Sequence, residues 1–240
     1  MGGRAARATV GWTRGLMHAW LKLDLAGPLM AFGGVAIDQV GPVRDFPAAS
    51  MLTGLFANAL GLEWRDRQAH QDIQDRLVFA AAIMREGVVI TDSQNAQLEK
   101  TDRGWTTWGE PEGRDGASYG APHRRRRDYL ADAHVVVVAR LVPGAPTTEH
   151  IRQALLRPAR PLFIGRKPCL PTRPILAGTV NAATAHDALI AALPDACGLR
   201  ACWPADEGPA GHRGQDLPDL RNWISGFHAG TRRVAEGRLP

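Results

Sequence analysis

Residues 119–129 combine residue types that bind RNA and, in some enzymes, cleave it. A histidine and four consecutive arginines lie between two tyrosines, and the set is Tyr119, His123, Arg124, Arg125, Arg126, Arg127 and Tyr129. Guanidinium groups match the geometry of phosphate, and aromatic rings stack on bases. A solvated surface run is the alternative, but a predicted buried strand follows this run directly. We therefore favour RNA contact.

The same segment contains the parts of a metal-independent ribonuclease. Such an enzyme needs a general base near the attacking 2′-hydroxyl and a cation or donor for the charge that develops on phosphorus. His123, Tyr119 and a neighbouring arginine could supply them. One histidine in an arginine run is weak support for catalysis, so we predict a non-catalytic binding protein and keep the endoribonuclease as the alternative.

Two further groups are candidate RNA contacts. Arg166 and Lys167 follow a short apolar segment at 161–165, which we expect to be a strand, in a turn where Gly165 permits close backbone approach. An ordinary proline-rich turn explains this pattern equally well. Trp105 and Trp108 lie in a polar stretch, where they could insert between bases or pack the stretch against the body.

Metal and cofactor chemistry find little support in the sequence. The cysteines Cys169, Cys197 and Cys202 have no paired spacing, and His186-Asp187 has no partner ligands nearby. Neither a glycine-rich phosphate loop nor a nucleophile elbow is present. We expect no bound metal and no cofactor.

The net charge of +5 is concentrated in one part of the 240-residue chain. Residues 119–175 carry eleven Arg or Lys against three Asp or Glu, so the remainder is slightly acidic. Only three of the 29 cations are lysines. Because no basic amphipathic helix stands out, nucleic acid is a better partner than a membrane. With no signal peptide or membrane span in the sequence, we expect a cytoplasmic protein.

Hydrophobic periodicity predicts an α+β fold. The expected elements are a strand at 19–25, helices at 47–62 and 66–75, a hairpin of strands 77–84 and 88–91, a central strand at 133–142, a helix from Thr147 or Thr148 to 156, a strand opening at 178–181, a helix at 184–193 capped by Thr184, and a last strand at 199–203. This order fits an RRM-like or ferredoxin-like antiparallel sheet with helices on one face. Residues 92–129 lack a period and form a long insertion.

Several segments resemble one known family. They are Leu25–Gly33, Asp45–Gly61, the Arg-Arg-x-Tyr-Leu-x-Asp-Ala motif at 126–133, the Pro-x-Phe-x-Gly-Arg-x-x-Cys-x-Pro turn at 161–171, and the closing segments 219–223 and 232–234. In this order they resemble the CasD family of type I-E CRISPR Cascade complexes, within the RAMP superfamily. The similarity implies one RAMP-type domain at 18–240 and an N-terminal extension at 1–17.

The resemblance also implies a function. A thumb insertion at 92–129 would grip the 5′ handle of the crRNA, and the partners would be that handle and the backbone and large subunits of Cascade. The positions that match handle contacts are Ser50, Arg126, Arg127, Tyr129, Arg166 and Lys167. Another subunit cuts the guide in type I-E systems, so the chain would be non-catalytic. Ala48-Ala49 stands where many family members have Thr-Lys, which removes one expected phosphate contact.

Overall fold

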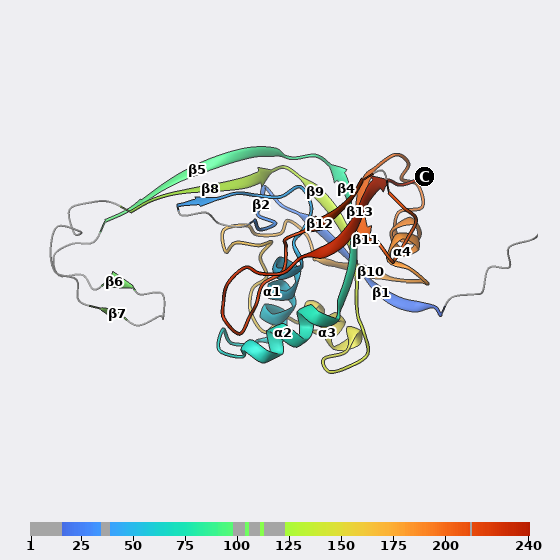
Figure 1. The fold of residues 1–240 in the computed structure, drawn as a ribbon, viewed down its shortest axis with the longest axis horizontal. Helices are drawn as coiled ribbons and strands as arrows, with labels where there is room; N and C mark the ends of the chain where they lie inside the picture. The colour runs from blue at the N-terminus through green and yellow to red at the C-terminus, as the bar shows by residue number, and fades with distance from the viewer. Residues whose placement is uncertain (1–15, 35–38, 98–103, 106–110, 113–122, 212) are drawn as a thin grey trace, which may run out of the picture.

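The computed structural model describes residues 16–34, 39–97, 104–105, 111–112, 123–211 and 213–240. Its main feature is a seven-stranded antiparallel sheet in the order β10-β1-β9-β4-β11-β13-β12 (Figure 1). The strands are β1 (His18–Ala26), β4 (Leu77–Arg85), β9 (His134–Leu141), β10 (Leu176–Ala182), β11 (Arg200–Pro204), β12 (Arg213–Leu217) and β13 (Arg232–Arg238).

Half of this sheet forms a ferredoxin-like unit. Helices α1 (Ala49–Leu60) and α2 (Arg67–Arg76) connect β1 to β4, and α3 (Thr148–Leu156) lies between β9 and β10. The spatial order β10-β1-β9-β4 is that of a split βαββαβ motif. The predicted α+β class is therefore confirmed. The helix caps at Thr147 and Thr184 are also confirmed, since each hydroxyl accepts a backbone N–H three residues later.

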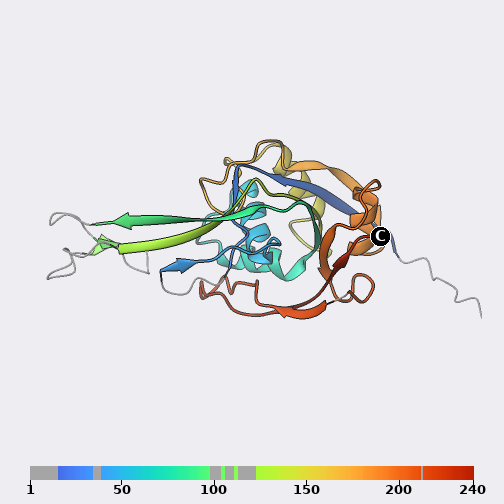
Figure 2. The same cartoon turned by 90° about the horizontal axis from the view of Figure 1, so that it is seen from above.

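The helices cover both faces of the sheet, which differs from the expected single face. Side chains of α1, α2 and α3 share one core with Leu23 and Val137, whereas α4 (Ala185–Ala192) shares a second core with Trp20 and Val138. The continuous apolar run at 135–138 is buried on both sides for this reason. Figure 2 shows α1 and α4 in separate parts of the molecule.

The predicted hairpin of residues 77–84 and 88–91 is wrong. Strand β4 pairs with β9, whereas β5 (Val88–Ala96) pairs along its whole length with β8 (His123–Ala131). The chain leaves the main sheet at Gly87, where an added Cβ would lie 2.7 Å from the Ala133 Cβ. The β5–β8 ribbon is thus an extension of the β4–β9 hairpin, and Glu86-Gly87 marks a bend rather than a turn.

Residues 92–129 are accordingly not a plain irregular loop. The β5–β8 ribbon projects from the body (Figures 1 and 2), and every residue of β5 is exposed. Short strands β2 (Leu29–Met30) and β3 (Val40–Gly41) pair with β8 on its other side, and β6 (Gly104–Trp105) pairs with β7 (Pro111–Glu112). Neither face of the ribbon is buried along most of its length, so its strands lack the alternation of apolar and polar residues that would mark them in the sequence.

Two further expectations need correction. Residues 161–165 form no strand, and the strand at 199–203 is not the last, because β12 and β13 follow it. The connection between β12 and β13, residues 218–231, returns to α1 and α2 and matters for the site below. Among the described residues, no helix is long and apolar enough to cross a membrane.

Candidate nucleic-acid interface

A pocket of about 370 Å³ lies where the base of the ribbon, the start of α1 and two loops converge. Its lining residues are Ala31, Gly33, Gly34, Gly41, Ser50, Met51, Arg127, Gly165, Arg166, Arg221, Trp223 and His228. Three arginines and a histidine are present, and none of the lining residues is acidic. We call this the cationic pocket.

Two guanidinium groups of the cationic pocket meet above Gly41. A Cβ at residue 41 would lie 2.8 Å from Arg127 Nη1 and 2.9 Å from Arg166 Nη2, so a larger residue there would displace these two guanidinium groups. Strand β3 brings this glycine opposite Arg127 of β8. Desolvation, and then the charges of Arg166 and Arg125, lower the pKa of Arg127. Two crowded cations without a described carboxylate between them are a site for an anion.

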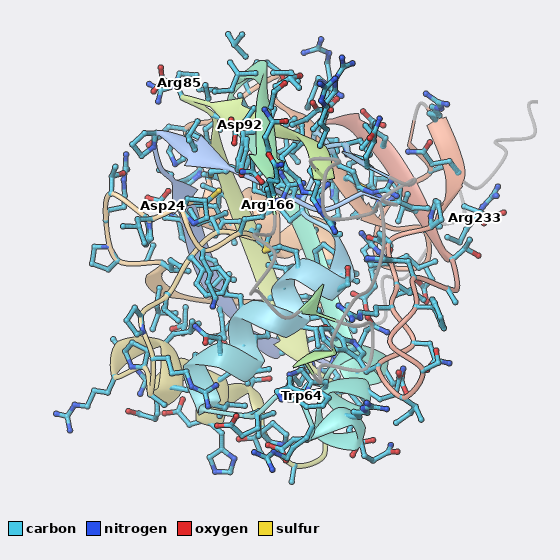
Figure 3. The ribbon with its side chains drawn as sticks, turned by 90° about the vertical axis from the view of Figure 1, so that its left-hand side faces the viewer. Asp24, Trp64, Arg85, Asp92, Arg166 and Arg233 are labelled. Atoms are coloured by element: carbon cyan, nitrogen blue, oxygen red, sulfur yellow. The ribbon has the colours of Figure 1, made fainter. Side chains whose placement is uncertain are left out.

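Arg166 is held by the protein backbone. Its Nη1 donates to the Asp128 carbonyl at 2.9 Å and its Nη2 donates to the Gly41 carbonyl at 3.1 Å. Its guanidinium also lies 4.9 Å from the centroid of the Tyr129 ring. Figure 3 shows Arg166 near the centre of the end of the molecule from which the ribbon projects. These contacts fix the guanidinium in place before any ligand binds.

The turn that carries Arg166 is closed by its own backbone. Ile164 N–H donates to the Cys169 carbonyl, and Cys169 N–H donates to the Arg166 carbonyl, both at 2.8 Å. Gly165 has φ of 90°, and a Cβ there would overlap the Ala31 carbonyl oxygen at 1.6 Å. Glycine at this position therefore lets the turn pack directly on the chain after β2.

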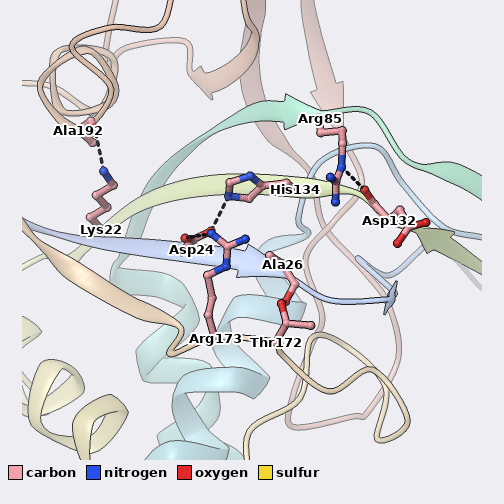
Figure 4. Close-up of polar contacts among 9 residues, drawn as sticks. All are labelled: Lys22, Asp24, Ala26, Arg85, Asp132, His134, Thr172, Arg173 and Ala192. Atoms are coloured by element: carbon pink, nitrogen blue, oxygen red, sulfur yellow. Dashed lines mark hydrogen bonds and ion pairs between the residues drawn. The ribbon is translucent and has the colours of Figure 1, made fainter.

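The same loop is anchored at its far end to β1 (Figure 4). Thr172 N–H donates to the Ala26 carbonyl at 2.9 Å, and Arg173 Nη1 lies 3.2 Å from Asp24 Oδ2. His134 Nε2 of β9 lies 2.5 Å from Asp24 Oδ1. The loop is thus held at both ends, which limits how far Arg166 can move.

The N-terminus of α1 already holds an anionic group. Ala49 N–H donates to Asp219 Oδ2 and Ser50 N–H donates to the Asp219 carbonyl, each at 3.1 Å. The Asp219 carboxylate also accepts two hydrogen bonds from Arg232 Nε, at 2.9 and 3.1 Å. A phosphate therefore cannot use these two N–H groups in this structure, and Ser50 faces the cationic pocket only as a lining residue.

Residues 221–228 complete the cationic pocket, and sequence analysis did not select them. Gln74 of α2 clamps this segment: its Nε2 donates to the Arg221 carbonyl at 2.8 Å, and its Oε1 accepts from Arg221 N and Trp223 Nε1, both at 3.1 Å. The Trp223 ring stacks on His70 with centroids 4.7 Å apart. A Trp and a His in a glycine-containing tail were the available signal, but no periodicity marked them.

The surroundings of Arg221 and His228 disfavour the charged form of each side chain. Arg221 Nε is buried and has no hydrogen-bond partner among the described atoms, and desolvation lowers the pKa of Arg221. Desolvation, then the charges of Arg221 and Arg44, lower the pKa of His228. A bound anion would relieve both effects, because it supplies a partner for the donor and offsets the repulsion.

The structure brings together only some of the predicted RNA contacts. Ser50, Arg127 and Arg166 line the cationic pocket, whereas Arg124, Arg125, Arg126 and Lys167 are exposed outside it. Trp105 lies in β6 and His123 begins β8, and only the backbone of these two is described. Trp108 and Tyr119 lie outside the described residues.

Tyr129 does not fit the stacking role. Only 4% of its surface is exposed, and its ring packs in the core and against Arg166. Alternation along β8 turns the side chain of residue 129 to the same face as Arg127, which leads it into the body. We therefore infer that Tyr129 holds the Arg166 side chain in place and does not contact a base.

Metal ligands do not cluster in the part of the chain that the structure describes. No three His, Cys, Asp or Glu side chains come together there in a way that could hold an ion. Cys169 and Cys202 are buried free thiols, and burial raises the pKa of both, that of Cys202 to about 11. The fold and site together define a ferredoxin-like α+β protein with a pocket lined by arginines.

Comparison with known proteins identifies the family. The model of the CRISPR-associated protein family Cas5 matches residues 20–235, and the chain belongs to this family. A relative from Escherichia coli (strain K12), the CRISPR system Cascade subunit CasD, is 29% identical over 175 residues, which are 72% of this chain and 77% of that protein.

Solved structures share the fold. A chain of a CRISPR RNA-guided surveillance complex superposes with a TM-score of 0.65 at 23% identity, covering 92% of this chain and 90% of that one. The crystal structure of a Cas protein gives a TM-score of 0.58 at 24% identity, with coverage of 92% and 95%. These solved structures thus share the overall fold of this chain.

Proposed function

We propose that this chain is a non-catalytic crRNA-binding subunit of a CRISPR surveillance complex of the Cascade type, acting in the cytoplasm and gripping the 5′ handle of the guide RNA. The observation that carries the proposal is the cationic pocket, where Arg127, Arg166, Arg221 and His228 converge without an acidic lining residue. Membership of the Cas5 family and similarity to CasD support the same function.

The arrangement of the cations suits a single RNA strand. Arg166 is fixed by two carbonyls, and the Arg221 guanidinium lies 5.0 Å from the centroid of the Trp223 ring, so binding a phosphate costs little side-chain entropy. Arg124 to Arg126 continue the positive charge along β8, away from the body. The phosphates of one strand could follow this path from the cationic pocket onto the ribbon, which would act as the thumb.

The protein partners in this proposal are the backbone and large subunits of the complex. The ribbon supports such contacts, because Val88, Val89 and Ile90 are exposed on β5 and, among the described strands, β5 pairs only with β8. Exposed apolar residues on an unpaired strand edge are a common place for another chain to bind.

A binding assay with purified chain and labelled handle RNA in EDTA tests the proposal. The three pocket arginines contribute about −2 to the slope of log affinity against log salt, or about twentyfold between 50 and 200 mM, and contacts along β8 make the slope steeper. Arg127→Gln removes one contact and makes the slope shallower by about 0.7. Arg233→Gln is the matched control, because Arg233 is exposed on β13 and pairs with Asp216. Equal loss in both variants would contradict a pocket-specific site.

Denaturing gels of the same mixtures test the endoribonuclease alternative. The non-catalytic subunit leaves the RNA intact. A discrete cut that His123→Ala abolishes would instead make this chain a repeat-processing enzyme, because His123 is the candidate general base.

A further inference from the structure

The tip of the loop between β12 and β13 is rigid and carries an exposed aromatic ring. Asn222 N–H donates to the Phe227 carbonyl at 2.9 Å, and Gly226 N–H donates to the Asn222 carbonyl at 2.8 Å. The Asn222 side chain accepts from Ser225 N–H at 2.9 Å. Residues 222–227 therefore form a closed loop, which we call the tip loop.

The tip loop is fixed to the body next to the cationic pocket. Arg221 and His228, which flank it, form an antiparallel bridge, and both line the pocket. Gln71 and Gln74 hold its first residues, and Arg67 Nη1 donates to the Ile224 carbonyl at 3.0 Å. In Figures 1 and 2 the loop that contains it extends toward the end of the molecule from which the ribbon projects.

Phe227 is 74% exposed although its backbone is fixed. A single exposed apolar side chain is common on protein surfaces. Phe227 is a candidate because it is an aromatic ring on a fixed backbone and adjoins His228, which lines the cationic pocket. Their Cα atoms are about 3.8 Å apart, so a nucleotide next to one whose phosphate occupies the pocket would pass close to Phe227. Phe227 itself does not line the pocket.

We propose that Phe227 is a stacking platform for a base of single-stranded RNA, at the nucleotide next to the one whose phosphate enters the cationic pocket. This inference rests on the proposed RNA-binding function and adds a base contact to it. Positive charge beside an aromatic ring is the combination that binds single strands, because phosphates bind the cations while bases stack. Arg221 supplies that charge, and His228 adds to it when it takes up a proton on binding.

Other exposed apolar side chains nearby fit the role less well. Trp64 is also exposed, but the Arg67 guanidinium lies 5.6 Å from the centroid of its ring and covers one face, and Trp64 does not adjoin a lining residue of the cationic pocket. Ile224 lies in the same tip loop, is 47% exposed and has no ring. Ile224 is therefore the matched control for Phe227, because a protein partner would use both apolar side chains and a stacked base would use only the ring.

The test measures the affinity of the full chain for fluorescent handle RNA by anisotropy, at fixed salt. Phe227→Ala is expected to weaken binding about tenfold, and Phe227→Leu nearly as much, whereas Phe227→Tyr and Ile224→Ala stay within about twofold of the parent. An RNA series with a single abasic nucleotide at each position should contain one RNA for which Phe227→Ala costs nothing further, since the stacked base is already missing.

The outcomes separate this inference from the function on which it rests. If the parent chain binds RNA but Phe227→Ala binds equally well, the stacking platform is wrong and the cationic pocket stands. If Phe227→Leu restores full affinity, apolar area rather than stacking matters, and a protein-docking role replaces the proposal. If the parent chain binds no RNA, the proposed function fails, and this inference fails with it.

Discussion

Removing the Asp219 carboxylate should destabilise the protein more than any other single charge change near the pocket. Asp219 is 2% exposed and accepts hydrogen bonds from Ala49 N–H of α1 and from Arg232 Nε of β13. The Arg232 guanidinium also lies 4.1 Å from the centroid of the Phe79 ring. One carboxylate thus joins a helix N-terminus, a strand and the loop that completes the cationic pocket.

The expected cost follows from these contacts. Deleting one partner of a buried ion pair costs about 3–5 kcal/mol, because the other charge stays buried and unpaired. Loss of an N-terminal acceptor alone costs about 1 kcal/mol, and the two effects overlap since one carboxylate serves both. We expect Asp219→Ala to lower the free energy of unfolding by about 3–5 kcal/mol in total, and Asp219→Asn by less, because its amide oxygen can still accept from α1.

Urea unfolding and thermal melts of the purified variants measure this effect. For a chain of this size, a loss of that magnitude lowers Tm by about 6–20 °C. Asp216→Ala is the control: Asp216 also pairs with an arginine of β13, Arg233, but both side chains are largely exposed, so we expect about 0–1 kcal/mol. Equal stability of Asp219→Ala and Asp216→Ala would refute the argument that burial makes this pair important.

Two other changes test the turn and the histidine of the cationic pocket. Gly165→Ala should lower both stability and RNA affinity, because its Cβ would overlap the Ala31 carbonyl at a φ of 90°. Thermal melts and anisotropy should show the two losses together. A melting temperature equal to that of the parent chain would contradict this packing. Desolvation, and then the charges of Arg221 and Arg44, hold the pKa of His228 below its ordinary value of 6.5. A bound phosphate raises that pKa. RNA binding therefore takes up a proton, so affinity should rise as pH falls from about 7.5 to 5.5, tenfold for each unit of pKa change. In His228→Gln this slope should flatten; an unchanged slope would exclude the histidine. The same lowered pKa makes the free protein lose stability as pH falls below 6.5, because the unfolded chain binds the proton more tightly.

Local patterns were sufficient for most of the elements. Alternation at 19–25 and the β-branched run at 135–138 correctly predicted the two strands at the centre of the ferredoxin-like unit. Threonines at 147 and 184 marked helix starts because a hydroxyl can satisfy an unpaired backbone N–H only at such an end. The four arginines from 124 to 127 indicated an anionic ligand, and one of them, Arg127, lines the cationic pocket.

Long-range pairing was decided by the tertiary structure alone. Strand β4 meets β9 across an insertion, because the partner that buries the most apolar surface need not be the next strand in sequence. Strands β5 and β8 continue from β4 and β9, so this pairing brings them together although β5 itself is exposed.

The pocket depended on tertiary structure for a related reason. Arg221 and His228 reach Arg127 and Arg166 only because Gln74 and Asp219 fasten the 218–231 loop to the two helices. Hydrogen bonds between residues 147 and 170 positions apart leave no periodic trace in the sequence, so only the folded chain reveals them. The sequence determined the helices, most strands of the main sheet and the sign of the charge, and tertiary packing decided the remaining strands and which charges meet.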